Sequence, residues 1–168
     1  MNDLTLRPGE EKDLPDLLEI HNHFVRETAV TFEMEEVTLE NRCEWLQGFD
    51  ERGPHQLLIA ESEDGVIGYA ASSRYLERPA YARSVMTSVY LHPDHTGRGI
   101  GRILYQALID QLIRSDAVHR AYALVRIPNP ASESLHGKLG FREVGVLDEA
   151  GYKLGSYHSV RIYERRMD

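Results

Sequence analysis

The sequence has little cysteine and no long hydrophobic run. Its one cysteine, Cys43, has neither a partner for an internal disulfide nor a second cysteine at metal-ligand spacing. No segment approaches the ~20 consecutive apolar residues of a membrane-spanning helix. The opening residues, MNDLTLRPGEEKD, lack the apolar stretch of a secretory signal. With 19 basic against 27 acidic residues, the formal net charge is −8, which argues against a nucleic-acid or anionic-membrane surface.

The residues that are present are typical of a globular enzyme or binding domain. Apolar residues make up 42% of the chain, which is enough for a hydrophobic core. We find no internal repeat, low-complexity tract or Ser/Gly linker, so we expect residues 1–168 to form one domain. A cytoplasmic location is expected because the sequence shows no targeting segment and no disulfide.

Hydrophobic periodicity predicts a mixed α/β fold. Strands are expected at 3–7, 56–62, 66–74, 84–92, 119–126, 141–147 and 156–166. Helices are expected after Asp13, a plausible N-cap, and after Thr38, where Leu39, Cys43 and Leu46 form an apolar stripe. Further helices are expected over 131–139 and over 100–112, whose apolar stripe is Ile100, Ile103, Leu104, Ala107, Leu108 and Leu112. An Asp-Gly pair at 64–65 is typical of a hairpin, whereas the strand-helix-strand passage from 84 to 126 requires a parallel crossover. We therefore expect a mixed sheet with helices on both faces.

The most informative stretch is residues 96–102, TGRGIGR, which joins a strand to a strong amphipathic helix. Glycines allow left-handed backbone and close approach to a ligand, and the first turn of a helix has unpaired N–H groups. Together they predict a phosphate cradle made of main chain, with local positive charge from Arg98 and Arg102. Neither common nucleotide motif fits, because Arg102 stands where each requires glycine. A glycine-rich turn without a ligand is the alternative.

At this point the sequence resembles a known family. Residues 96–101 look like the pyrophosphate loop of GNAT-superfamily N-acetyltransferases, and residues 129–141, NPASESLHGKLGF, look like that superfamily's second cofactor segment. Residues 31–33, 88–91 and 151–158 are similar to the phosphinothricin/methionine-sulfoximine acetyltransferase branch. The resemblance covers nearly the whole chain. It implies a GNAT-like sheet of about seven strands, in which a splayed parallel pair, here 84–92 and 119–126, holds acetyl-CoA. It also implies a homodimer.

The resemblance further implies roles for individual residues. His136 stands where relatives carry Tyr or His near the CoA sulfur, and an imidazole can relay protons near neutral pH. A helix-terminal histidine that partly covers the core is the alternative. The implied cofactor-binding residues are Val89, Tyr90, Leu91, Gly97, Arg98, Gly99, Ile100, Gly101, Arg102, Asn129 and Lys138. The implied acceptor-binding residues are Phe32, Glu33, Arg74, Tyr81 and Arg83. On local grounds Asn129 could equally be a turn residue before Pro130, and the two acceptor arginines could be simple surface charge.

One departure from the family concerns the base. Met86 stands where close relatives have a glutamate, and a methionine cannot accept a proton. His136, or Glu33 through water, could take the proton; otherwise the amine is already neutral or the chemistry is weak. We expect an acetyl-CoA-dependent N-acetyltransferase that acts on the primary amine of a small amino-acid-like molecule. The alternative is a CoA-binding sensor or regulatory module with weak or lost catalysis.

Overall fold

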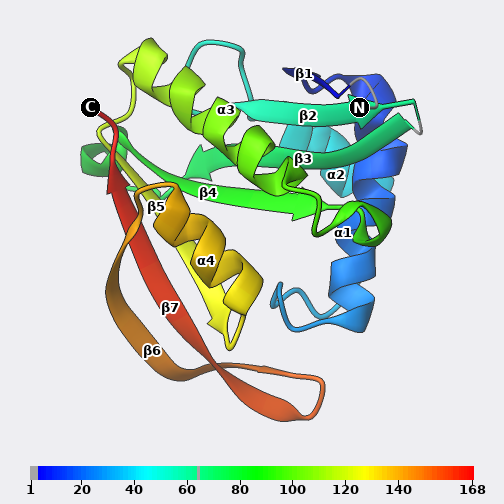
Figure 1. Cartoon of the computed structure of the whole chain (residues 1–168), viewed down its shortest axis with the longest axis vertical. Coiled ribbons are helices and arrows are strands. Elements are labelled where there is room, and N and C mark those ends of the chain that lie inside the picture. Colours follow the sequence, from blue (N-terminus) through cyan, green and yellow to red (C-terminus); the bar gives the residue numbers. More distant parts are fainter. Residues whose placement is uncertain (1–3, 64) are drawn as a thin grey trace.

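Seven strands form one mixed sheet in the order β1-β2-β3-β4-β5-β7-β6 (Figure 1). The computed structural model describes residues 4–63 and 65–168. The strands are β1 (Thr5–Pro8), β2 (Leu57–Ser62), β3 (Gly65–Arg74), β4 (Ser84–Leu91), β5 (Arg120–Ile127), β6 (Arg142–Lys153) and β7 (Ser156–Arg166). The helices are α1 (Leu14–Glu27), α2 (Leu39–Leu46), α3 (Ile100–Ser115) and α4 (Pro130–Lys138). No helix among the described residues is long and apolar enough to cross a bilayer.

The predicted order of elements and the mixed sheet are confirmed. Within the described residues, each predicted strand and helix is present, with β6 extending six residues beyond its expected end at Leu147. β2 and β3 pair antiparallel, as the Asp-Gly signal predicted, although residue 64 itself, like residues 1–3 of the first predicted strand, lies outside the described residues. β4 and β5 pair in parallel.

Two hydrophobic cores lie on opposite faces of this sheet. Leu58 and Ala60 of β2 belong to the larger core with α3, whereas Leu57 and Ile59 belong to a second core with α1. Because successive side chains of a strand point to opposite faces, α1 and α3 cover opposite faces of the sheet. α4 lies on the same face as α3, since its Leu135 packs against the larger core. We call the two sides the α3 face and the α1 face.

Local details depart from the sequence expectations. Asp13 precedes α1 as expected, but its carboxylate does not cap the helix; it accepts two hydrogen bonds from Arg7, each 2.7 Å long. Thr38 does cap α2, since its hydroxyl accepts from the amide of Asn41 at 3.2 Å. Leu39 and Ile103, expected in the buried stripes, are 50% and 51% exposed. Each lies on the side of its helix that faces solvent.

The parallel pairing between β4 and β5 is short. Among the described residues it holds three pairs, from Ser84–Arg120 to Met86–Tyr122, while β4 stays paired with β3 and β5 with β7 along their lengths. The Thr87 hydroxyl donates to the Tyr122 carbonyl at 3.0 Å, at the last of these pairs. The Thr87 side chain therefore occupies the point where the strands part.

The position of Thr87 between the two strands gives a prediction for stability. Thr87→Val keeps the side-chain shape but removes the hydroxyl that lies 2.6 Å from the buried Tyr105 hydroxyl, and an unsatisfied buried polar group costs about 2 kcal/mol. We expect the free energy of unfolding, measured by urea titration, to fall by that amount. Thr5→Val on the exposed end of β1 is the control, because a surface substitution should change stability by less than ~0.5 kcal/mol. Equal stability of both variants would contradict the role of the hydroxyl.

Candidate active site

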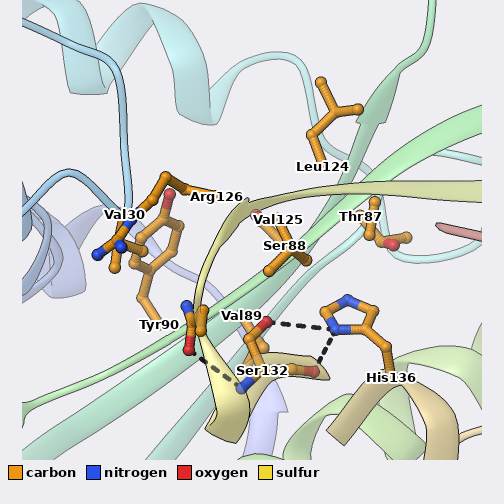
Figure 2. Close-up of a pocket in the computed structure, with 12 residues that line it drawn as sticks. Val30, Thr87, Ser88, Val89, Tyr90, Leu124, Val125, Arg126, Ser132 and His136 are labelled. Atoms are coloured by element: carbon orange, nitrogen blue, oxygen red, sulfur yellow. Dashed lines mark hydrogen bonds between the residues drawn. The ribbon is translucent and has the colours of Figure 1, made fainter. Parts of the chain in front are cut away.

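A cleft opens where β4 and β5 part, and α4 lies beside it (Figure 2). The residues that line it come from both strands, from α4 and its N-cap, and from the loop after α1. They are Val30, Thr87, Ser88, Val89, Tyr90, Ala123, Leu124, Val125, Arg126, Asn129, Ser132 and His136. The cleft therefore lies between the strands that the sequence resemblance assigned to the splayed pair.

The cleft is lined by main-chain groups of β4 that have no ladder partner. The His92 amide donates to the Ile67 carbonyl on the β3 side at 2.8 Å, and the Arg83 carbonyl accepts from the His119 amide on the β5 side at 2.7 Å. Backbone groups alternate sides along a strand, so the odd-numbered residues Val89 and Leu91 face the gap. Buried backbone groups require hydrogen-bond partners. The gap can therefore hold an extended ligand that carries amide groups.

The glycine turn between β4 and α3 presents free amides. Gly97 and Gly99 have φ values of +76° and +80°, in the left-handed region that favours glycine. Within the described part of the chain, no acceptor takes the N–H groups of residues 97–101, whereas the Arg102 amide donates to the Gly99 carbonyl at 3.1 Å. The run of free amides thus ends one residue earlier than the sequence predicted. Five free amides at the start of a 16-residue helix favour a bound phosphate.

His136 lies on the α3 face of the cleft and is 4% exposed. Its ring stacks on Tyr163 with centroids 5.0 Å apart, and the edges of Phe141 and Tyr105 lie nearby at 5.2 and 5.4 Å. α4 sets this position, because the His136 Nδ1 lies 2.7 Å from the carbonyl of Ser132, one helical turn earlier. His136 therefore packs against the core, as the alternative interpretation expected, and it also lines the cleft, while its role in proton transfer stays a prediction.

The hydrogen bonds of His136 fix its neutral tautomer. The Ser132 carbonyl can only accept, so Nδ1 carries the proton and Nε2 carries a lone pair. The Tyr105 hydroxyl lies 3.4 Å from Nε2 but only 2.6 Å from the Thr87 hydroxyl, whose own proton goes to the Tyr122 carbonyl. Burial lowers the pKa of His136 below its ordinary value, and the bond to Ser132 opposes this in part. Nε2 is therefore a proton acceptor at neutral pH.

The other predicted cofactor residues surround the cleft and the turn. Asn129 both lines the cleft and caps α4, because its Oδ1 accepts from the Ser132 amide at 3.2 Å. Arg98 and Arg102 are exposed at the glycine turn, and Lys138 is exposed at the end of α4. The Tyr90 ring lies on the α1 face, stacked on Tyr69 with centroids 5.4 Å apart.

Two predicted acceptor residues lie on the loop after α1. The Phe32 ring packs against Gly151, where a Cβ would come within 2.3 Å of it, and it lies 6.2 Å from the His158 ring. Glu33 contacts the His21 Nε2, and the His21 Nδ1 lies 2.9 Å from the Tyr69 hydroxyl. The bond from His21 holds the pKa of Glu33 below its usual value. A carboxylate so stabilised is a weak base.

None of the five acceptor candidates is among the residues that line the cleft, and the other three have their contacts away from it. The Tyr81 ring lies edge-on to Tyr75, which stacks on Tyr122 beyond the closed end of the gap. Arg74 pairs with Glu77 at the surface at 3.2 Å. Arg83 donates to the Asp116 carbonyl at 2.7 Å, at the far end of α3. For both arginines the surface-charge interpretation fits the structure, and the expected place in an acceptor site does not.

The sequence interpretation missed residues that the cleft brings together. The Thr87 hydroxyl bonds the Tyr122 carbonyl, and the Ser132 carbonyl bonds His136; no sequence motif predicts either hydrogen bond. The sequence did contain a signal for Arg126 as a cleft residue. In the run 120–127, RAYALVRI, it interrupts the apolar residues of a strand, three residues before the predicted cofactor segment begins at Asn129. A charged residue within such a strand indicates either solvent or a polar cleft.

Comparisons with known proteins agree with this geometry. Residues 17–141 match the acetyltransferase (GNAT) family. The chain belongs to the GNAT acetyltransferase family. It is 48% identical to phosphinothricin N-acetyltransferase of Streptomyces coelicolor over 97% of this chain and 96% of that protein. It is 31% identical to the L-methionine sulfoximine/L-methionine sulfone acetyltransferase of Salmonella typhimurium, over 98% and 95% of the two chains.

Solved GNAT structures share the fold. An acetyltransferase from Salmonella typhimurium, determined with its cofactor acetyl-CoA, superimposes with a TM-score of 0.93 at 30% identity, covering 99% of this chain and 95% of that one. A phosphinothricin acetyltransferase from Sinorhizobium meliloti in complex with acetyl-CoA gives 0.89 at 29% identity, covering 97% and 88%. The predicted GNAT fold, the acetyltransferase activity and the use of acetyl-CoA are confirmed.

The residues present fit acetyl-CoA. The free amides of residues 97–101 suit a diphosphate, and the space beside them is open, since a Cβ at Gly97 or Gly99 would meet no atom within 4 Å. The unpaired backbone groups of Val89 and Leu91 suit the amide-bearing arm that follows the diphosphate.

The glycine turn gives the second prediction. Gly99→Glu places a carboxylate where the diphosphate would lie, and like charges in contact cost several kcal/mol. We expect the affinity for acetyl-CoA, measured by isothermal titration calorimetry, to fall about 100-fold. Gly155→Glu is the matched control, because Gly155 has a φ of +78° and equally open space, but lies in the β6–β7 turn. Unchanged affinity in Gly99→Glu would remove the phosphate assignment from this turn.

Proposed function

We propose that this protein transfers an acetyl group from acetyl-CoA to the primary amine of a small amino-acid-like acceptor, of the phosphinothricin or methionine sulfoximine type. The observation that carries the proposal is the β4–β5 cleft, which is lined both by His136 on the α3 face and by Tyr90 on the α1 face. Such a cleft lets a cofactor on one face meet an acceptor on the other. The names of the relatives support the class of acceptor.

The cofactor would be held by main chain and by a few side chains. The amides of residues 97–101 would bind the diphosphate, with Arg98 and Arg102 adding positive charge. Val89 and Leu91 would bond the extended arm, with Tyr90 between them, while Asn129 and Lys138 would contact it from α4. Acetyl-CoA supplies an acyl group already activated as a thioester. A preorganised N–H of β4 facing the thioester oxygen would stabilise the negative charge that grows there.

His136 is the group that we propose for proton transfer. Its Nε2 carries a lone pair and its lowered pKa keeps it neutral at pH 7. Nε2 would therefore accept the proton that the attacking amine loses and donate it to the departing thiolate of CoA. Met86 cannot take this part, because a thioether is not a base, and Glu33 is held by His21. Phe32 and Glu33, on the loop after α1, would instead shape the acceptor side.

The activity is tested by release of free CoA thiol from acetyl-CoA. We expect turnover with phosphinothricin or methionine sulfoximine and little with water alone. Thermal stabilisation by acetyl-CoA without turnover on any amine in a panel of amino acids would contradict the enzyme and favour the CoA-sensing alternative. No observation in the structure or among the relatives described above favours that alternative.

His136→Phe is the third prediction. Phenylalanine keeps the stack on Tyr163 but removes the ring nitrogens, so kcat should fall about 100-fold while the KM for acetyl-CoA changes little. In the unaltered protein, kcat/KM should fall on the acid side, at a pH below the ordinary imidazole range, because burial lowers the pKa of His136 and protonation then removes its lone pair. That fall should be absent from the variant. His119→Ala, at an exposed histidine, is the control. Equal kcat in His136→Phe and the parent would retire the proposed role.

We also propose that residues 1–168 form a single domain that acts in the cytoplasm as a homodimer. Six apolar side chains of β6, β7 and their turn are at least 40% exposed: Val144, Val146, Leu147, Tyr152, Leu154 and Tyr157. Several exposed apolar side chains on one hairpin are typical of an interface. As the fourth prediction, sedimentation velocity should give a dimer, and Val146→Glu should shift it toward monomer. A monomer at all concentrations would contradict the homodimer.

A further inference from the structure

Among the residues that line the cleft, the acceptor side has one cationic side chain, that of Arg126. Ala123 and Val125 of β5 point into the core on the α3 face, so Leu124 and Arg126, which alternate with them, lie on the α1 face. Of the described residues that line the cleft on this face, Arg126 alone carries a formal charge. The remainder of the lining there is apolar or uncharged. A single guanidinium in such surroundings can determine which acceptors bind.

The Arg126 side chain is oriented across the cleft and is only partly satisfied. Figure 2 shows it reaching from β5 toward Tyr90 of β4 and Val30 of the loop after α1. Its Nη1 donates to the Pro128 carbonyl at 3.0 Å, whereas its Nε is buried and has no hydrogen-bond partner among the described residues. No carboxylate in the described part of the chain pairs with it. A buried, unpaired donor on a cation costs free energy unless a ligand meets it.

The chemistry of this group points to a planar oxyanion. A guanidinium presents donors in a fixed fork that matches both oxygens of a carboxylate, and Nε is one prong of that fork. In an α-amino acid the amine and the carboxylate are bonded to the same carbon. Fixing the carboxylate at Arg126 would therefore hold the amine within a short reach of the facing β4 segment at Val89. The other arginines considered for this task, Arg74 and Arg83, already have partners elsewhere.

We propose that Arg126 binds the α-carboxylate of the acceptor and so selects free amino acids over amines that lack this group. The inference rests on the proposed acetylation of amino-acid-like acceptors and assigns the specificity of that site to a residue of β5. The bond pairs Nε and the neighbouring terminal nitrogen with the two carboxylate oxygens. No proton moves in this step, so Arg126 positions the acceptor and His136 remains the group for proton transfer.

The test compares methionine sulfoximine with its neutral α-carboxamide in Arg126→Gln and the parent. We expect the parent to prefer the free acid by about 100-fold in kcat/KM, and Arg126→Gln to lose that preference through a raised KM. Arg126→Lys should recover part of it, because a lysine keeps the charge but not the fork. Arg142→Gln, an identical change at an arginine of β6 that pairs with Glu164, should match the parent. The KM for acetyl-CoA should stay within about twofold throughout.

Two outcomes would overturn the inference. The first is an Arg126→Gln variant that keeps its thermal melting point and its preference for the free acid. The second is a raised KM for acetyl-CoA, which would place Arg126 on the cofactor. If the parent acetylates neither compound, the proposed function fails, and calorimetric binding of methionine sulfoximine then tests Arg126 separately. Equal affinity in the parent and Arg126→Gln would sink the carboxylate site, whereas weaker binding to the variant would support it.

Discussion

Two parallel strands that stay bonded to their outer neighbours but part from each other leave a row of main-chain groups without partners. In this protein β4 keeps its ladder to β3 and β5 keeps its ladder to β7, while the β4–β5 pairing ends at Met86–Tyr122, where the Thr87 hydroxyl also bonds the Tyr122 carbonyl. The unpaired groups of Val89 and Leu91 can be satisfied only by water or by a ligand in strand geometry. The cleft thus results from hydrogen bonding in the sheet, and the side chains around it add to that frame.

The opening in the sheet also presents different groups on its two faces. On the α3 face, the free amides before α3 and the lone pair of His136 suit a phosphorylated cofactor and the movement of a proton. On the α1 face, Tyr90 and the side chain of Arg126 suit an acceptor. In a chain with a net charge of −8, a diphosphate is better held by backbone dipoles than by the overall field, because the amides act only at close range.

Much of the fold could be predicted because strands and helices leave periodic signals in the sequence. The stripe Leu104, Leu108 and Leu112 fixed α3, and it is fully buried. Where the prediction failed, the competing partner lay far along the chain. Asp13 looked like a helix cap, but Arg7 from β1 takes its carboxylate. Leu39 fitted the period of α2 but lies on its solvent side, because a period shows that a face exists and not how wide the covered part is.

The sequence by itself determined the order of the elements, the glycine turn before α3 and, through resemblance, the family. These features are encoded within short segments, where neighbours in the chain are neighbours in space. The tertiary structure alone decided which side chains meet in the cleft: that His136 presents Nε2 as an acceptor, that Arg83 turns to Asp116, and that Arg126 crosses toward Tyr90. Each of these depends on the register between strands and on the splay, which bring together residues far apart in sequence, and no local pattern encodes such distances.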